Sequence, residues 1–391
     1  MRLLHTGDWH LGKIFYDINL FDDQNYFIEQ VLAELKLADS QGAPYGALCI
    51  PGDIYDRASP AIDAINMLNN FLCRVHNLFP SLHIFILSGN HDNPSRLGFG
   101  SELFELANVH ICKDTKSIQK AVIVDNCAIY QLPFLSSGSF DDFGLNGALS
   151  QTELYSYAVQ KILESHKKNH PDLPLVLCAH ASVAACDEAE KLDSVGTLDF
   201  ISGNIFSEFT YIALGHIHKF QKVAPNAYYS GSPLAYSFDD VPKKYMLRVD
   251  IDSKFERGFN VTKIEIKPLH QVIQFKTDFF DLYNNDYSWC KDYYIQLIRT
   301  DFENIPDAKK ILKQKFPLLL SIVREELSSG NSSSSLLIKK NALKNNGALS
   351  AEEAFSSFME EMYGKENIPE LFEEEKKLFI ELYKTCSEEE V

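Results

Sequence analysis

The chain of 391 residues carries 37 basic and 54 acidic residues, so its formal charge is −17. Proteins that coat DNA present basic surfaces, and this charge argues against that simple class. Hydrophobic residues make up 45% of the chain, which excludes global disorder and, at this length, predicts two domains with an appendage. We see neither a signal-peptide pattern nor an apolar run as long as a membrane span, and we expect a cytoplasmic protein.

The cysteines indicate a reducing environment. All eight stand singly, without a C-x-x-C pair, and several lie inside apolar segments typical of strands. We therefore expect reduced thiols in the core, and neither disulfides nor a zinc knuckle.

The first polar loop, HTGDWHLGK, nearly matches the phosphate-binding pattern G-x-x-x-x-G-K-[ST]. That pattern needs a hydroxyl after the lysine to hold magnesium, but Ile14 stands there, and the carboxylate of Asp8 would repel phosphate. Asp8 and His10 alternate after an apolar run, so they can point the same way, as two metal ligands would. Taken alone, such a pair is more often part of a solvated loop, and the rest of the chain decides between these interpretations.

Up to about residue 268, short apolar runs alternate with helical patterns, which predicts an α/β fold. Four of these runs lead through a small residue into Asp, Asn or His: ALCIPGDIYD, IFILSGNHD, LVLCAHA and YIALGHIH. Because open α/β sheets place their sites at strand ends, we expect these polar residues to share one crevice.

Together with the first loop, the strand ends offer a mixed set of carboxylate, amide and imidazole ligands: Asp8, His10, Asp53, Asn90, His91, His180, His216 and His218. This mixture suits two divalent ions of the manganese, iron or zinc type. Asp53 is the natural bridge, because one shared carboxylate can hold two ions about 3.5–4 Å apart.

The remaining chain divides by composition. Residues 269–327 read as strand, strand, helix and strand, a small α/β capping module that follows the main domain of residues 1–268. Residues 328–349, with the run SSGNSSSS, read as a flexible linker. Residues 350–391 have thirteen acidic and four basic residues and two apolar stripes at helical spacing, which predicts a helical hairpin that packs on its own domain or docks to a partner helix.

The ordered motifs D-x-H, GD-x-x-D, GNHD, a lone His and GH-x-H resemble the calcineurin-like metallophosphoesterases. Within that superfamily HTGDWHLGK, PGDIYD, SGNHD, VGTLDF, YIALGHIH and YSGSP are similar to those of the SbcD-type nucleases, over nearly the whole chain. The resemblance implies an αββα sandwich with a small α/β capping domain and a C-terminal helical hairpin. It also implies two divalent ions, manganese in the first place with magnesium as an alternative, and a homodimer joined through the helix near residues 62–75.

The same resemblance implies the activity and the partners. These are ATP-dependent 3′ to 5′ exonuclease action on double-stranded DNA and endonuclease cutting of hairpins and single strands, in repair, recombination and replication. The chain contains no complete P-loop, so energy from ATP would come from an SbcC-type ATPase, held by the C-terminal hairpin.

Carried over position by position, the family roles fall on nine residues. Asp8, His10, Asp53 and His218 would bind one ion, and Asp53, Asn90, His180 and His216 the other. His91 would face the scissile phosphate, and the carboxylate of Asp56 would orient it. Lys13 either contacts the DNA backbone or is solvated. The sequence CAHA around His180 departs from relatives that have glycine beside this histidine.

Two other functions fit parts of the pattern. A phosphomonoesterase or protein phosphatase could use the same core, and Asp56-Arg57 echoes a D-R pair of protein phosphatases, but the chain reads GNHD where those read GNHE. A nonenzymatic scaffold would have lost metal ligands, and none is missing. Lysines of the capping module and the linker offer phosphate contacts, although a charge run is more often a solvated face.

Overall fold

The first sheet of the computed structural model carries the N-terminal strand near its centre. Six strands follow the order β16 (Phe259–Ile266), β15 (Lys244–Ile251), β1 (Arg2–His5), β4 (Ala47–Ile50), β5 (His83–Leu87) and β6 (Val109–Cys112). The strands from β1 to β6 pair in parallel, whereas β15 pairs antiparallel with both β1 and β16. The structure describes residues 1–136, 138–139, 143–144, 150–184, 201–240, 243–301, 305–325 and 376–379.

The second sheet repeats this arrangement with later parts of the chain. Its order is β13 (Gln221–Ala224), β14 (Ala227–Tyr229), β12 (Tyr211–Gly215), β9 (Leu175–His180), β8 (Cys127–Leu132) and β7 (Val122–Val124). The four central strands are parallel, and the two edge strands, β13 and β7, are antiparallel to their neighbours. The carboxyl ends of parallel strands therefore gather at one edge of each sheet.

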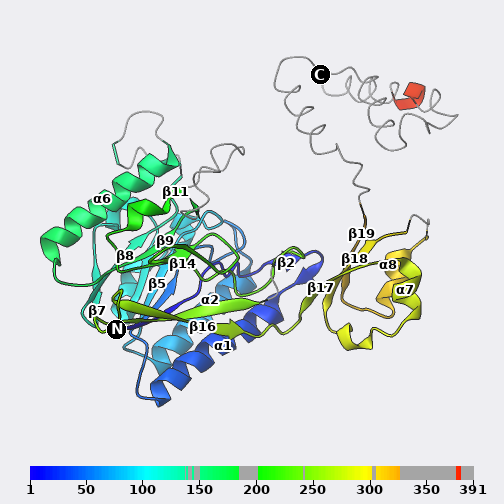
Figure 1. Cartoon of the computed structure of the whole chain (residues 1–391), viewed down its shortest axis with the longest axis horizontal. Coiled ribbons are helices and arrows are strands. Elements are labelled where there is room, and N and C mark those ends of the chain that lie inside the picture. Colours follow the sequence, from blue (N-terminus) through cyan, green and yellow to red (C-terminus); the bar gives the residue numbers. More distant parts are fainter. Residues whose placement is uncertain are drawn as a thin grey trace. The chain divides into compact units, whose positions relative to one another are not determined.

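Helices cover the outer faces of the two sheets (Figure 1). Helices α1 (Phe21–Ser40) and α2 (Ile62–Leu78) pack on the first sheet, and α6 (Gln151–Asn169) packs on the second. A third apolar cluster, which includes Leu3, Phe85 and Tyr211, fills the space between the sheets. The predicted αββα sandwich is confirmed.

The sequence of each long helix accounts for its place. In α1 the buried residues Phe27, Val31 and Leu35 recur every four positions, which forms one apolar stripe. Helix α6 begins with a capping box, in which Ser150 and Glu153 satisfy each other's backbone N–H groups. Short helices α3 (Pro94–Leu97) and α4 (Ser101–Phe104) follow β5, and the small hairpin of β2 (Ile14–Phe15) and β3 (Ile18–Asn19) precedes α1. Strands β10 (Val183–Ala184) and β11 (Ile201–Ser202) form a separate parallel pair.

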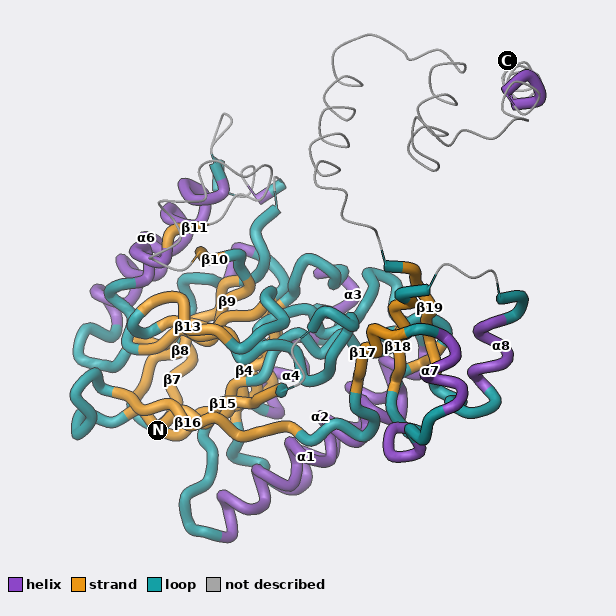
Figure 2. Tube along the Cα trace, turned by 45° about the vertical axis from the view of Figure 1, so that its right-hand side comes forward, coloured by secondary structure: helices purple, strands orange, loops and turns teal. Residues whose placement is uncertain are grey.

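Residues 272–324 form a separate three-stranded parallel sheet, visible at the right of Figure 2. Its strands are β17 (Val272–Thr277), β18 (Tyr294–Arg299) and β19 (Leu319–Arg324), with helices α7 (Phe279–Asn284) and α8 (Ala308–Lys313). The predicted strands and α8 are present, but α7 was not expected. The carboxylate of Asp278 starts α7 by accepting a hydrogen bond from the N–H of Asp281, at 2.7 Å.

Three predicted segments fall outside the described residues: the linker 328–349, the motif VGTLDF and, apart from a helical turn at 376–379, the helical hairpin 350–391. The six cysteines that the structure describes are free thiols, and five of them are buried, as expected. No helix among the described residues has the length and apolarity needed to span a bilayer.

Candidate metal centre

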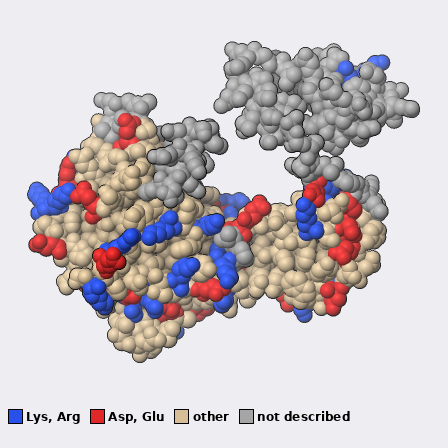
Figure 3. All heavy atoms as spheres, viewed as in Figure 1, with Lys and Arg blue, Asp and Glu red and all other residues tan. Residues whose placement is uncertain are grey.

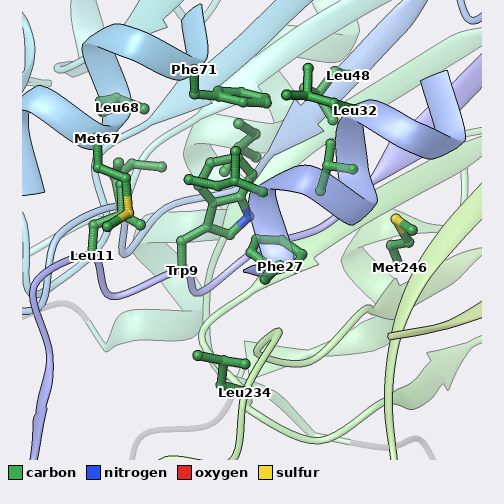
Figure 4. Close-up of a cluster of buried hydrophobic side chains, with 14 of the residues drawn as sticks. Trp9, Leu11, Phe27, Leu32, Leu48, Met67, Leu68, Phe71, Leu234 and Met246 are labelled. Carbon is green, nitrogen blue, oxygen red and sulfur yellow. The ribbon is translucent and has the colours of Figure 1, made fainter. Parts of the chain in front are cut away.

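The loop after β1 places Asp8 and His10 by anchoring the residue between them. Trp9 is fully buried, and its ring meets those of Phe27 and Phe71 edge to face, with centroids 5.3 and 5.1 Å away (Figure 4). Asp8 and His10 adopt left-handed backbone angles, with φ of 54° and 44°. Non-glycine residues rarely do this, and such strain is typical of functional loops held by their surroundings.

The loops after β4 and β5 are joined by a buried carboxylate. Asp92 accepts hydrogen bonds from the backbone N–H groups of Ile54, Tyr55 and Gly89, at 2.9–3.0 Å. Burial raises the pKa of Asp92 to about 6, while these donors favour its ionised form. The sequence contained this residue within GNHD, but its hydrogen bonds, which hold the two loops of candidate ligands together, were not predicted.

Asp53 lies at the centre of the cluster. Its Oδ2 atom is 3.6 Å from His10 Nε2 and 3.6 Å from His180 Nε2, so one carboxylate oxygen faces ligands from both sheets. Its Oδ1 atom accepts a hydrogen bond from the backbone N–H of His91, at 2.9 Å. An oxygen that faces both sets of ligands would allow Asp53 to bridge two ions.

On one side of Asp53 stand Asp8, His10 and His218. The Nε2 atoms of the two imidazoles are 3.0 Å apart, although the residues are 208 positions apart in sequence. Asp8 accepts a hydrogen bond from the backbone N–H of His216, at 2.8 Å, which ties the loop after β1 to the loop after β12.

On the other side stand Asn90, His180 and His216. The amide oxygen of Asn90 lies 3.0 Å from His180 Nε2 and 3.0 Å from His216 Nδ1. His180 Nδ1 lies 2.8 Å from the carbonyl oxygen of Pro51, which only accepts, so Nδ1 carries the proton and Nε2 keeps its lone pair. The structure thus brings all seven expected metal ligands together.

The electrostatics of the cluster fit bound divalent cations. Asp8 Oδ2 and His10 Nδ1 are buried and have no hydrogen-bond partner among the described residues. Burial raises the pKa of Asp8 well above its usual range, with the charge of nearby Asp53 adding to the rise, and burial also raises the pKa of Asp53. Burial lowers the pKa of His10 to about 2 and those of His180, His216 and His218 to about 4. Neutral imidazoles are ready ligands, and cations would supply the missing charge.

His91 and Asp56 lie beside this cluster, but their contact differs from the expected one. His91 Nδ1 donates to the main-chain carbonyl oxygen of Asp56, at 3.0 Å. The Asp56 carboxylate instead accepts a hydrogen bond from Lys13 Nζ at 2.8 Å and lies 3.7 Å from His10 Nδ1. The reason is the orientation of Asp56 in its loop, which turns the side chain towards Lys13 and the carbonyl towards His91. Lys13 is therefore paired, and its amine also lies over the ring of Tyr236, at 5.4 Å.

One buried cation near His218 escaped the sequence analysis. Lys244 donates hydrogen bonds to the carbonyl oxygen of His218 at 3.0 Å, to Ser232 Oγ at 3.1 Å and to Asp240 Oδ2 at 2.6 Å. The first of these bonds holds the backbone of His218 in place. The motif YSGSP, which contains Ser232, was the available signal, but nothing in it pointed to a lysine on β15.

In sequence the chain is similar to known phosphoesterases and to a nuclease subunit. A family model described as calcineurin-like phosphoesterase matches residues 1–220. The chain is 28% identical over 332 residues to a protein named as the SbcD component of the nuclease SbcCD from Staphylococcus saprophyticus, and the match covers 83% of this chain and 85% of that relative. A solved structure of phosphopantetheinyl hydrolase from Mycobacterium tuberculosis is 13% identical and has a TM-score of 0.31, covering 59% of this chain and 89% of the other. Because the family match covers more than half of the sequence, the chain belongs to the calcineurin-like phosphoesterase family.

Proposed function

We propose that this protein is a two-metal DNA nuclease that hydrolyses phosphodiester bonds at DNA ends and hairpins. The observation that carries the proposal is the position of Asp53 Oδ2, 3.6 Å from a histidine nitrogen of each ligand set. Asp8, His10 and His218 would hold one ion and Asn90, His180 and His216 the other, with Asp53 between them. Two divalent cations held there would supply positive charge to the phosphate and make water more acidic.

His91 would act on the substrate itself. Its Nδ1–H is donated to the Asp56 carbonyl, so the proton for the leaving oxygen would come from Nε2 of the doubly protonated imidazolium, which would then become the neutral ring. The hydrogen bond from its backbone N–H to Asp53 fixes His91 relative to the bridging carboxylate. Such proton donation is worth about 10²–10⁴-fold in rate.

The partners follow from the relative, whose name makes it one component of the nuclease SbcCD. We propose that this chain works with an SbcC-type ATPase bound by residues 350–391, and that in this complex it has 3′ to 5′ exonuclease and endonuclease activity in repair, recombination and replication. Manganese is the proposed metal, and the cytoplasm the proposed compartment. The exposed Ile62 and Ile65 on α2 support a homodimer through this helix.

The test uses end-labelled linear and hairpin DNA with manganese, with and without the ATPase partner. Wild type is compared with His91→Ala, and bound metal is measured for both. We expect His91→Ala to keep its metal and lose about 100-fold or more of its cleavage rate. His170→Ala, which removes a partly exposed histidine at the C-terminal end of α6, is the matched control and should cleave as wild type does.

The alternative outcome is equally concrete. If wild type cleaves no DNA under any of these conditions but rapidly hydrolyses a phosphomonoester, the nuclease proposal fails and the phosphatase interpretation replaces it.

A further inference from the structure

The edge where the two sheets meet carries an open groove outside the metal centre. It is formed by β13 and β14 at the edge of the second sheet, and by β16, the edge strand of the first, with the turn that precedes it. The groove has a volume of about 510 Å³, and its lining includes Phe220, Lys222, Tyr228, Phe255, Arg257 and Lys263. Basic side chains and aromatic rings thus line the same groove on a protein whose net charge is acidic.

The basic residues of this groove lie against its rings. Lys263 Nζ is 4.8 Å from the ring centre of Phe220 and 4.9 Å from that of Tyr245, and Lys222 Nζ is 5.5 Å from that of Tyr228. Within the described part of the chain, no carboxylate lies within 4 Å of either amine. Both side chains are exposed, so the amines can turn to phosphates and leave the ring faces to other planar groups.

The groove begins next in sequence to a pocket beside the metal centre. His218, Lys219 and Tyr236 line that open pocket together with Asp239 and Asp240, and Phe220, which follows Lys219, lines the groove. Lys222 stands four positions after His218, a span of at most about 14 Å in extended chain. Figure 3 shows Lys and Arg side chains gathered on the face of the larger unit where Figure 1 labels β14 and β16.

We propose that this groove, which we call the edge groove, binds the single-stranded DNA that leads away from the metal centre. The inference rests on the proposed nuclease function. Single strands are bound by grooves that combine positive charge with rings on which bases stack, whereas duplexes hide their base faces. Lys222, Arg257 and Lys263 supply the charge, with Glu256 as the acidic residue of the lining, and Phe255 and Tyr228 supply the rings.

The experiment measures binding of a labelled oligothymidylate of about 16 nucleotides to the full chain in EDTA, over a range of salt concentrations. In Lys222→Ala/Lys263→Ala we expect affinity to fall about tenfold and the slope of log affinity against log salt to fall by about 1.4, since each phosphate contact on a single strand contributes about 0.7. Phe255→Leu, which removes a ring, should lower affinity about tenfold and leave the slope unchanged.

Two controls separate this inference from the proposed function. Lys36→Ala/Lys168→Ala removes two exposed lysines from α1 and α6 and should bind as wild type does. Lys222→Ala/Lys263→Ala, the edge-groove variant, should hydrolyse bis(p-nitrophenyl) phosphate with manganese at the same rate as wild type. Equal rates would show that its metal centre is intact.

Each contrary result points to one of the two proposals. If the edge-groove variant keeps wild-type affinity and slope, or if its loss equals that of the control variant, the edge groove is not the DNA path, even where wild type cleaves DNA. A loss for blunt duplex and none for the oligonucleotide would also overturn the single-strand assignment. If the variant loses oligonucleotide binding but wild type cleaves no DNA, the nuclease proposal fails while the edge groove stands.

Discussion

His5 is a buried histidine on β1 that takes no part in the metal cluster. Its Nδ1 lies 3.0 Å from the hydroxyl of Tyr211 and its Nε2 3.0 Å from the carbonyl oxygen of Leu214. Because that carbonyl only accepts, Nε2 carries the proton and Nδ1 accepts from Tyr211. Burial lowers the pKa of His5 to about 3, so the folded protein holds this imidazole neutral.

This lowered pKa predicts a loss of stability in acid. The unfolded chain takes up a proton near pH 6.5, whereas folded His5 does not, so stability is complete above pH 6.5 and falls as the pH drops towards about 3. Between pH 7 and pH 5 this single residue should cost about 2 kcal/mol of unfolding free energy. Urea unfolding of the metal-free protein at both pH values measures the loss.

The matched variant is His5→Gln, which keeps a donor and an acceptor but has no titrating ring. Its loss between pH 7 and pH 5 should be smaller than that of wild type by about 2 kcal/mol, whatever its stability at pH 7. Equal losses in the two proteins would show that His5 is not the residue responsible.

At the scale of single residues, the sequence predicted which residue types gather at the site but not the backbone angles that place them. Asp8, His10 and Asp53 all have positive φ, at 54°, 44° and 47°. No local sequence pattern predicts these positive φ angles, because tertiary contacts, such as those of the buried Trp9, impose them on the loops. The contact of His91 with a carbonyl oxygen was also invisible, since a sequence displays side chains and says nothing of where a carbonyl points.

Between elements, the close approach of the loop after β4 to the end of β9 depends on a glycine. Gly52 has a φ of +85°, and a Cβ atom there would lie 2.2 Å from His180 Nδ1. A methyl group at this position must displace the imidazole that faces Asp53.

We expect Gly52→Ala to weaken manganese binding about 10-fold or more, as changes that move a metal ligand do. Gly42→Ala is the control, because Gly42 also has positive φ, at +70°, but faces open space. Both variants should lose about 1 kcal/mol from the left-handed backbone, and only Gly52→Ala should lose metal. Isothermal titration calorimetry measures the manganese affinity of both variants and of wild type. An unchanged affinity in Gly52→Ala would refute the steric argument.

The element scale was the most predictable. Apolar runs that end in polar residues placed β4, β5, β9 and β12 correctly, because buried parallel strands read as continuous hydrophobic segments. Helix α7 was not predicted because its six residues are too few to show a helical period of hydrophobic residues. The pairing of β15 with β1 was also beyond prediction, since nothing local links strands more than 240 residues apart.

On the scale of the whole molecule, the small sheet is held to the sandwich by buried polar contacts. Asp23 on α1 accepts hydrogen bonds from the hydroxyl of Tyr294 at 2.7 Å and from the backbone N–H of His270 at 3.2 Å. Tyr294 and Leu320 join the apolar cluster under the first sheet. These contacts fix where the predicted capping module sits beside the larger core.

Tyr294→Phe should loosen this attachment without unfolding the sandwich. Loss of one buried donor to a carboxylate costs about 1–3 kcal/mol, which should appear as faster hydrogen exchange in β17 and β18. Tyr283→Phe removes a hydroxyl from a half-exposed ring of the same module and should leave exchange unchanged. Equal exchange in wild type and Tyr294→Phe would show that apolar packing alone holds the module.

The candidate metal cluster can form only late in the synthesis of the chain, because its ligands are far apart in sequence. Its ligands run from Asp8 to His218, and β1, which carries the first of them, is flanked on one side by β15, ending at Ile251. Because ribosomes release the chain from its N-terminus, more than half of the protein must emerge before any complete ligand set exists. A chain that ends before His218 therefore lacks a complete set of candidate ligands, and such unfinished copies of the proposed nuclease would not cut DNA.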